Sequence, residues 1–413
     1  MKRLGGRIYE RISDMSNIDL ADENARKNKV KSKKYIEEHD RFKFFDNYYL
    51  SEDLKNFTYK TSPYSKFKVY EPKERIIYKL PYYPDRICHH AILNVLKFYW
   101  EKLFIDQTYS CIKGRGIHKC IRDLRKALVD KKNTRYCLEI DIKKFYPNIN
   151  HKVLKEEIRR KIKDKHTLWL LDELIDSVKL IPGYKEKGVP IGNWTSQYFG
   201  NLILTPLDRF CKQELKCRYY FRYADDIRIL SNNKNYLQKV LCCIKLLCNQ
   251  LKLKVKGNYR IVDMKKKGTD FLGYVLRHNH VLLRKRMKLK MFRTIRKFLD
   301  GKITEDKFQR IFNSYRGWLK YCNSKHLLQK IKSLCGTAYH AFNGGEKKIS
   351  RITKDVIYFV DIDIRNTYFL IYFMFKGKPY YVKSRNRTIL GLIKWLRTRN
   401  IVLRSRSSLK RFY

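Results

Sequence analysis

The chain has 413 residues, of which 93 are Lys or Arg and 40 are Asp or Glu, so its formal net charge at pH 7 is +53. Hydrophobic residues make up 44% and aromatic residues 14% of the sequence, which excludes a disordered tail and predicts two or three compact units. The positive charge calls for a polyanionic partner such as a nucleic acid.

The cysteines and the apolar runs indicate where the protein resides. Eleven cysteines form no CxxC pair, so we expect small reduced core residues rather than a zinc site or disulfides. The longest apolar run, Tyr368 to Phe375, is far shorter than the roughly 18 residues that cross a bilayer. No signal-peptide core follows Met1, and we expect a soluble cytoplasmic protein.

The first 65 residues are polar and basic. They include the charge run Lys27 to Lys34, which is typical of a solvated face, with contact to RNA as the alternative. A group of aromatic side chains predicts that the later part of this segment docks onto the main body. These residues are Phe42, Phe44, Phe45, Tyr48 and Tyr49.

Residues 68–84 predict two short strands in a hairpin, with Arg75 opening the second strand. Residues 85–96 have helical apolar spacing, and His89 and His90 are interpreted as ordinary helix residues. Gly114-Arg115-Gly116 precedes another amphipathic helix. Glycines at a helix start allow close approach of a phosphate, to which an arginine adds charge.

Residues 136–147 predict a strand that carries Asp141 and ends at Phe145, Tyr146 and a proline. Helices are expected over 152–162 and 168–178. Residues 188–197 predict a loop and the start of a helix that continues to residue 204. We expect Thr195 and Ser196 to cap this helix and Pro206 to kink or break it.

Residues 221–230 predict two more short strands, with Asp225 and Asp226 at the tip between them. In so basic a chain, acids within an apolar β segment call for a cation, and carboxylate oxygens suit Mg²⁺. The alternative is an Asp-Asp turn with solvated side chains.

Asp141 and Asp225 can converge only if their strands pair in one sheet. Three carboxylates held that closely repel one another, and two metal ions about 3.5–4 Å apart would neutralise them. Such a site aligns a primer 3′-oxygen with a nucleotide phosphate, which is the chemistry of a polymerase.

The rest of the chain predicts helices over 235–251, 284–299, 304–321 and 324–342, with a turn at 271–274. Gly344-Gly345 marks a boundary. Beyond it we expect strands over 355–364 and 367–376, a turn at 377–379, a strand from 380, a helix over 388–399 and a last strand over 401–406. Asp361 and Asp363 share a strand face, but binding of RNA or a partner is favoured over a nuclease site.

Four segments in order resemble the reverse transcriptases. Tyr223-Ala-Asp-Asp226 resembles their YxDD box, and Asp141 with Phe145-Tyr146 resembles their first palm motif. Residues 188–197 resemble the nucleotide-binding loop and helix, and residues 271–274 resemble the primer-grip turn. The sequence is similar above all to bacterial enzymes of diversity-generating retroelements and of defence-associated groups.

The resemblance implies an α+β right-hand polymerase fold with fingers, a palm with an antiparallel sheet, a helical thumb and a small C-terminal α+β extension. The implied domains are a basic N-terminal extension 1–65, fingers 66–135, palm 136–149, a return to the fingers 150–187, palm 188–280, thumb 281–343 and accessory domain 344–413.

The resemblance also implies the roles of individual residues. Asp141, Asp225 and Asp226 would be catalytic and, with the Ile142 carbonyl, would hold two Mg²⁺ ions, with Mn²⁺ as a substitute. The implied nucleotide-binding residues are Lys68, Arg75, Phe145, Tyr146, Ile191, Gly192 and Gln197. The implied primer or template contacts are Arg115, Tyr223, Phe271, Leu272 and Gly273. Lys256 and Arg260 are candidates for the proton donor to pyrophosphate.

One departure from the family bears on accuracy. Many reverse transcriptases have Gln before the glycine of the nucleotide-binding loop, whereas this chain has Ile191. Loss of the amide predicts low-fidelity copying of RNA into DNA, in antiphage defence or in a diversity-generating retroelement.

Expected partners are an RNA template, including a dedicated noncoding RNA, the cDNA/RNA duplex, deoxynucleotides, and an accessory protein or second copy of the chain. The alternatives are an RNA-binding scaffold with a catalytically weak palm and an RNA-dependent RNA polymerase.

Overall fold

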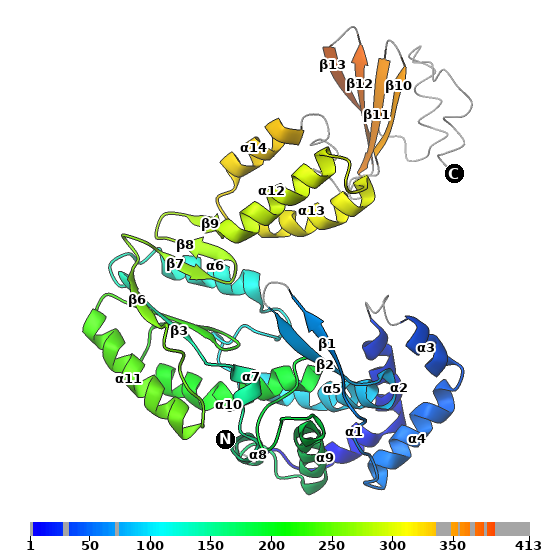
Figure 1. The fold of residues 1–413 in the computed structure, drawn as a ribbon, viewed down its shortest axis with the longest axis vertical. Coiled ribbons are helices and arrows are strands. Elements are labelled where there is room, and N and C mark those ends of the chain that lie inside the picture. Colours follow the sequence, from blue (N-terminus) through cyan, green and yellow to red (C-terminus); the bar gives the residue numbers. More distant parts are fainter. Residues whose placement is uncertain are drawn as a thin grey trace. The chain divides into compact units, whose positions relative to one another are not determined.

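The computed structural model describes residues 3–27, 33–70, 74–335, 348–353, 356–363, 368–375 and 378–384. The chain divides into two compact units, Met1–Leu282 and Leu283–Tyr413 (Figure 1). Within the described part of the chain, no helix is both long and apolar enough to span a membrane.

A four-stranded antiparallel sheet organises the first unit, with strand order β4-β5-β3-β6. Its strands are β3 (Tyr136–Asp141), β4 (Tyr219–Tyr223), β5 (Asp226–Ser231) and β6 (Arg260–Asp263). The middle residues of β3, β4 and β5 are buried, and most of them are apolar. The prediction that the two acidic segments pair in one sheet is confirmed.

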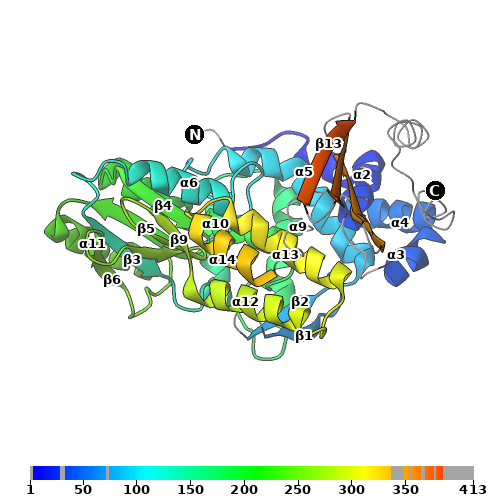
Figure 2. The same ribbon diagram turned by 90° about the horizontal axis from the view of Figure 1, so that it is seen from above.

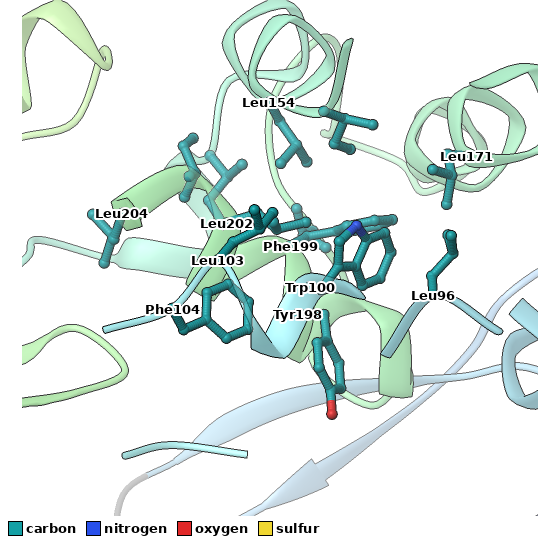
Figure 3. Packing of buried hydrophobic residues seen from close by; sticks show 14 of the residues in the cluster. Leu96, Trp100, Leu103, Phe104, Leu154, Leu171, Tyr198, Phe199, Leu202 and Leu204 are labelled. Carbon is teal, nitrogen blue, oxygen red and sulfur yellow. The ribbon is translucent and has the colours of Figure 1, made fainter. Parts of the chain in front are cut away.

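Helices with apolar faces cover this sheet. Helix α11 (Lys234–Gln250) packs on β3 and β5, and α6 (Ile117–Ala127) packs on β4. Helix α10 (Trp194–Arg209) lies among α5 (Ile87–Glu101), α8 (His151–Arg159) and α11. Figure 3 shows Trp100 of α5 beside Tyr198 and Phe199 of α10, with ring centroids 5.8 and 6.1 Å apart.

Helix α10 differs from the prediction at both ends. Thr195 and Ser196 are buried inside its first turn, and Asn193 precedes the helix without a side-chain capping bond. Pro206 does not end the helix, which continues to Arg209 and then into the π-helical turn η4 (Phe210–Glu214). Leu204 and Leu207 are fully buried on either side of the proline, so packing outweighs the lost main-chain hydrogen bond.

The predicted hairpin near the N-terminal end of the matched motifs is confirmed as β1 (Ser65–Val69) and β2 (Arg75–Lys79). The turn η2 (Tyr82–Arg86) leads from it into α5. Helix α7 (Phe145–Asn148) follows β3. The predicted helical pair is confirmed as α8 and α9 (Lys165–Asp176), followed by the 3₁₀ turn η3 (Ser177–Leu180).

The first 65 residues form a helical layer: α1 (Ile8–Ser13), α2 (Met15–Arg26), α3 (Lys33–Asp40) and α4 (Lys43–Lys55). Figures 1 and 2 both show α2 next to α5, against which it packs. The charge run at 27–34 falls largely outside the described residues.

The prediction of docking through the aromatic residues of this layer is wrong, although the layer does dock. The buried face of α4 consists of Asn47, Leu50, Ser51 and Leu54, at helical spacing. The five aromatic residues occupy the other faces and are 46% to 68% exposed. They are Phe42, Phe44, Phe45, Tyr48 and Tyr49.

A three-stranded sheet completes the first unit: β7 (Thr269–Phe271), β8 (Tyr274–Leu276) and β9 (Val281–Leu283). Leu272 and Gly273 form the predicted turn, with φ of 48° and 89°. Two consecutive positive φ values are typical of a tight two-residue hairpin turn.

The second unit contains the three predicted helices, α12 (Lys285–Leu299), α13 (Glu305–Leu319) and α14 (Lys325–Cys335). It also contains an antiparallel sheet of β10 (Lys348–Thr353), β11 (Val356–Asp363), β12 (Tyr368–Phe375) and β13 (Lys378–Ser384). Strand β10 was not predicted. The end of the third predicted helix, the helix over 388–399 and the strand over 401–406 lie outside the described residues.

Candidate active site

Three aspartates from two distant segments meet at one end of the central sheet. Asp141 ends β3 and lies directly opposite Asp226, which begins β5. Asp225 precedes Asp226 at the hairpin tip, and its carbonyl accepts a hydrogen bond from the Ile142 amide (3.3 Å). The backbones of the two acidic segments are therefore hydrogen-bonded to each other at the positions of the aspartates.

Burial and neighbouring charge disfavour the charged form of Asp225 and Asp226. Burial raises the pKa of Asp226 to about 6, although Arg228 counteracts it. Burial also raises the pKa of Asp225, and the charge of Asp141 adds to the effect. A cluster of carboxylates with raised pKa values is what an added cation would stabilise.

A buried ion pair holds the hairpin tip in shape. Arg222 is fully buried and donates to both carboxylate oxygens of Asp208, at 2.6 and 2.5 Å. It also donates to the Ala224 carbonyl at 2.9 Å. Ala224 has a φ of 52°, a conformation that an alanine adopts only when its surroundings impose it. The Arg222 bond supplies part of that constraint.

Arg228 contacts the acidic end of the sheet and was not predicted from the sequence. Its guanidinium binds the Asp226 carboxylate, the Thr269 hydroxyl (3.1 Å) and the Asp270 carbonyl (2.8 Å). Thr269 in turn donates to Glu139 (2.7 Å). The alternation of charged and apolar residues in 226–230 is the signal that could have found it, because a charge inside a buried strand requires a partner.

The aromatic pair after β3 lies beside these acids. Phe145 is buried, and its ring centroid is 5.1 Å from that of Tyr146. Burial raises the pKa of the Tyr146 hydroxyl, and the charge of Asp225 contributes to the rise. A Cβ added at Gly200 of α10 would lie 3.2 Å from the Tyr146 ring. The absence of a side chain at Gly200 therefore provides space for this ring.

The loop before α10 is attached to the β1–β2 hairpin. The Ile191 carbonyl accepts a hydrogen bond from the Tyr78 amide at 3.1 Å. Gly192 has a φ of 139°, and a Cβ there would lie 2.2 Å from the Tyr78 carbonyl oxygen. Only glycine fits this approach. Gln197 is exposed on the first turns of α10.

The structure does not bring Lys68 and Arg75 together. Lys68 lies opposite Ile76 and Arg75 lies opposite Val69, so the two basic side chains leave the hairpin on opposite faces. Lys68 forms an ion pair with Glu74 (3.1 Å). The charge of Arg75 acts on Asp225 and lowers its pKa against the effect of burial, so Arg75 is the one on the side of the aspartates.

The comparison with protein families shows to which family a chain with this site belongs. The family model described as "Reverse transcriptase (RNA-dependent DNA polymerase)" matches residues 66–276, just over half of the chain. The chain belongs to the reverse transcriptase family. The match covers every residue of the site described so far and confirms the right-hand polymerase fold.

Two of the similar proteins are from Escherichia coli. Protein YkfC of Escherichia coli strain K12 is 25% identical over 254 residues, covering 52% of this chain and 65% of that protein. The retron Ec73 reverse transcriptase of Escherichia coli is 25% identical over 197 residues, covering 45% and 60%. The chain thus spans less than two thirds of the length of these relatives.

Among solved structures, the telomerase from Candida albicans in complex with a TWJ fragment of telomeric RNA is 12% identical. It has a TM-score of 0.42 and covers 70% of this chain and 62% of that one. A likeness of this size carries no argument.

The other predicted contact residues lie around the same sheet and its loops. Arg115 donates to the Ile105 and Thr108 carbonyls, at 2.6 and 3.0 Å, and so holds its own loop. Tyr223 ends β4 opposite Asp226. Phe271 is fully buried, and the Arg228 guanidinium lies 4.6 Å from its ring centroid. Leu272 and Gly273 form the turn that follows it.

The two candidate proton donors differ in position. The Lys256 amide donates to the Asp141 carbonyl at 2.8 Å, so its backbone runs beside that of Asp141. Arg260 instead forms an ion pair with Glu139. The tertiary structure therefore favours Lys256 over Arg260.

The oxygen atoms at this end of the sheet fit divalent metal ions by their chemistry. Three carboxylates and the Ile142 carbonyl are hard oxygen ligands of the kind that Mg²⁺ and Mn²⁺ prefer. Within the described ranges, however, no three His, Cys, Asp or Glu side chains are arranged to hold a metal ion. The Asp226 carboxylate is bound to Arg228 instead.

Proposed function

We propose that the protein is an RNA-directed DNA polymerase in which Asp141, Asp225 and Asp226 form the catalytic centre. The observation that carries the proposal is the register of the sheet. Asp141 and Asp226 are cross-strand partners, and Asp225 lies next to them at the tip. Family membership over residues 66–276 supports the same reaction class.

Two divalent ions bound by these carboxylates and the Ile142 carbonyl would activate the primer 3′-oxygen and stabilise the leaving pyrophosphate. The chain's own residues position the reactants. Arg75, on the side of the aspartates, would bind the triphosphate. The Gly192 loop, held to β2, would shape the nucleotide pocket.

The proposal is tested with a DNA-primed RNA template, Mg²⁺ and deoxynucleotides. Asp225→Asn is expected to abolish primer extension, because it removes a carboxylate while preserving the side-chain shape. Asp263→Asn is the matched control. Asp263 lies in the same sheet opposite Tyr136, at the far end of β3 from Asp141, and its variant should extend the primer normally.

A catalytically weak RNA-binding scaffold is the second candidate. The bond between Arg228 and Asp226 favours it, because that bond occupies an acid that a metal would need. The scaffold predicts tight RNA binding with no extension in Mg²⁺ or Mn²⁺ by the wild-type chain. Extension that disappears in Asp225→Asn contradicts it.

We further propose that Tyr146 selects deoxynucleotides. Its ring packs against Phe145 and lies close to Gly200. There it would clash with the 2′-hydroxyl of a bound ribonucleotide. Tyr146→Ala should raise the use of ribonucleotides relative to deoxynucleotides, measured by single-nucleotide incorporation. Equal use of both by the wild-type chain contradicts this role and favours an RNA-dependent RNA polymerase.

Low fidelity is proposed from Ile191, whose aliphatic side chain supplies no hydrogen bond to the nucleotide. Ile191→Gln should lower the error frequency of the cDNA, measured by sequencing products from one template. Identical error spectra for variant and wild type contradict it. The proposed biological roles are antiphage defence and a diversity-generating retroelement, which the neighbouring genes would distinguish.

A further inference from the structure

A cavity of about 1080 Å³ lies within the first unit, between the N-terminal helical layer, the β1–β2 hairpin and the start of α10. We propose that it binds unpaired nucleotides of the RNA template ahead of the base being copied. The inference rests on the proposed polymerase function, but Arg86 and Tyr35, the residues that carry it, have no part in the polymerase mechanism proposed above.

Arg86 provides the site for a phosphate. Its Nε donates to the Ala25 carbonyl at 3.1 Å, and no carboxylate in the described part of the chain lies within 4 Å of its guanidinium. Burial lowers the pKa of Arg86, which is the opposite of what a neighbouring carboxylate does. A half-buried guanidinium of this kind calls for an anion from outside.

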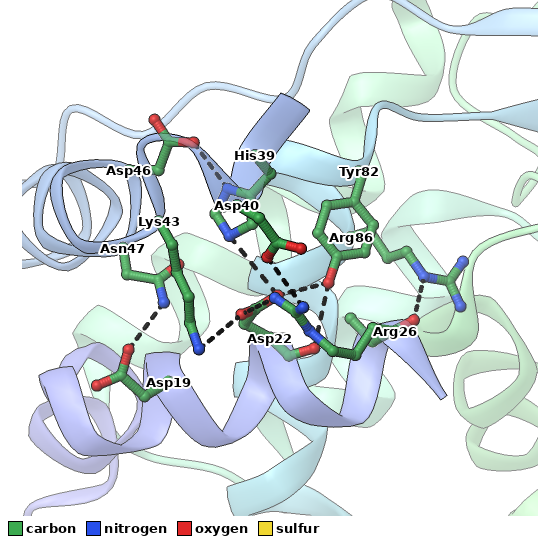
Figure 4. A network of polar contacts seen from close by, with 11 residues as sticks. Asp19, Asp22, Arg26, His39, Asp40, Lys43, Asp46, Asn47, Tyr82 and Arg86 are labelled. Atoms are coloured by element: carbon green, nitrogen blue, oxygen red, sulfur yellow. Dashed lines mark hydrogen bonds and ion pairs between the residues drawn. The ribbon is translucent and has the colours of Figure 1, made fainter. Parts of the chain in front are cut away.

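Asp22, an acid on the neighbouring helix α2, already has its own partners. It is fully buried and accepts hydrogen bonds from Arg26 and Tyr82, both at 2.5 Å, while Lys43 lies 3.5 Å away. Figure 4 shows the Arg86 guanidinium turned away from the Asp22 carboxylate. Asp22 therefore does not compete with a phosphate for Arg86.

Aromatic rings in the lining provide faces for a base. The exposed Tyr35 ring lies 4.4 Å from the Lys79 ammonium, and both residues line the cavity. The Trp194 ring, also in the lining, lies 4.3 Å from the His90 ring. Aromatic faces combined with cations are how proteins bind single-stranded nucleic acid.

The wall of the cavity also includes a buried histidine. His89 lines it and is 4% exposed. Its Nδ1 is hydrogen-bonded to the Thr195 hydroxyl at 2.7 Å, whereas its Nε2 has no hydrogen-bond partner among the described residues. Burial lowers the pKa of His89 to about 3, so this wall residue is neutral at pH 7 and adds no charge to the cavity.

The position of the cavity indicates which nucleic-acid strand it would bind. Its lining reaches Gly192 and Gln197, which the nucleotide-binding motif contributes. Its other wall comes from residues that precede the family match at 66–276, among them Asn24, Tyr35, Phe42 and Asp46. A template nucleotide bound there would lie next to the base being copied. The N-terminal helical layer would then be an addition of this chain to the polymerase fold.

The test measures the affinity of the full-length protein for DNA-primed RNA templates with 5′ overhangs of increasing length, by fluorescence anisotropy without deoxynucleotides. Wild-type affinity should rise as the overhang lengthens beyond the single templating base. Arg86→Gln should lose about tenfold in affinity for the long overhang and lower the salt slope by about one. Arg86→Lys should restore most of the affinity.

The matched control is Arg209→Gln. Arg209 is also half-buried and donates to a main-chain carbonyl, that of Leu103 at 3.2 Å, but it does not line the cavity. Equal losses for both variants would overturn the proposal. Tyr35→Ala, a substitution of an exposed ring, should also reduce the overhang effect, which keeps the test valid if Arg86→Gln folds poorly.

Two further outcomes separate the possibilities. Wild-type affinity that is independent of overhang length overturns the proposal even if the protein extends primers. Displacement of the long overhang by a free nucleoside monophosphate at equal nucleotide concentration would assign the cavity to mononucleotides instead of the template. Because no deoxynucleotide is present, an enzyme that fails to extend primers still gives a readable result.

Discussion

Gly192 shows how one residue sets the distance between two elements. We expect Gly192→Ala to lower the free energy of unfolding by about 1–3 kcal/mol, the usual range for local backbone strain. Its Cβ would lie 2.2 Å from the Tyr78 carbonyl oxygen, and its φ is 139°. Urea denaturation checks this, with Gly257→Ala as control, since a Cβ at Gly257 meets nothing within 4 Å. Equal stability of the two variants would contradict it.

Arg228 also stabilises the fold. It connects Asp226 of the central sheet to Thr269 of β7, so the two sheets share one buried guanidinium. Arg228→Met should lower the free energy of unfolding by about 1–3 kcal/mol, because it leaves buried polar groups without partners.

A double-mutant cycle with Thr269→Val measures the coupling between these two residues. The control for Arg228 is Arg260→Met, because Arg260 also pairs with an acid of the sheet but its side chain is 50% exposed. A smaller loss for Arg228→Met than for Arg260→Met would refute the role assigned to Arg228.

Among the elements, α3 is attached to its neighbours through a buried histidine. His39 lies between Asp22 of α2 and Asp46 of α4, with its Nδ1 2.7 Å from Asp46 and its Nε2 3.6 Å from Asp22. Its ring also packs on Tyr82 and Tyr83 of η2. Burial by itself lowers the pKa of His39, but the two carboxylates outweigh it and the pKa is raised.

The sign of the pH dependence follows. Because the folded pKa of His39 lies above the unfolded value of about 6.5, its stabilisation is fully present below that pH and is lost as the pH rises through the folded pKa. Wild type should therefore lose more stability between pH 6 and pH 9 than His39→Gln does. Urea denaturation at both pH values measures the difference.

Asp46→Asn should reduce this pH dependence without removing it, since Asp22 remains beside the ring. A pH dependence that is the same in wild type and His39→Gln would show that His39 does not titrate as a charged partner of these acids.

For the whole molecule, the net charge of +53 predicts a binding mode dominated by phosphates. If the protein neutralises about five phosphates of a duplex, doubling the salt concentration should weaken binding by about tenfold or more. Anisotropy titrations with primed RNA between 100 and 300 mM salt would check this. A slope near zero would indicate that the charge does not serve nucleic-acid binding.

Much of the fold could be predicted from local patterns. The strands that carry Asp141 and Asp226, the β1–β2 hairpin, the turn at Leu272-Gly273 and the three helices of the second unit follow from alternation, helical spacing and turn residues. The docking face of α4 could not be predicted, because its aromatic residues outnumber the two leucines that are buried. Which face docks depends on the partner surface.

The sequence by itself determined the reverse transcriptase motifs, because each is a short run whose residue types and order carry the chemistry. The tertiary structure alone decided that Arg228 binds Asp226, that Lys68 and Arg75 leave opposite faces of their hairpin, and that the N-terminal helices close a cavity beside Gly192. The reason is physical: those facts depend on sheet register and on packing between segments far apart in the chain, which no local pattern encodes.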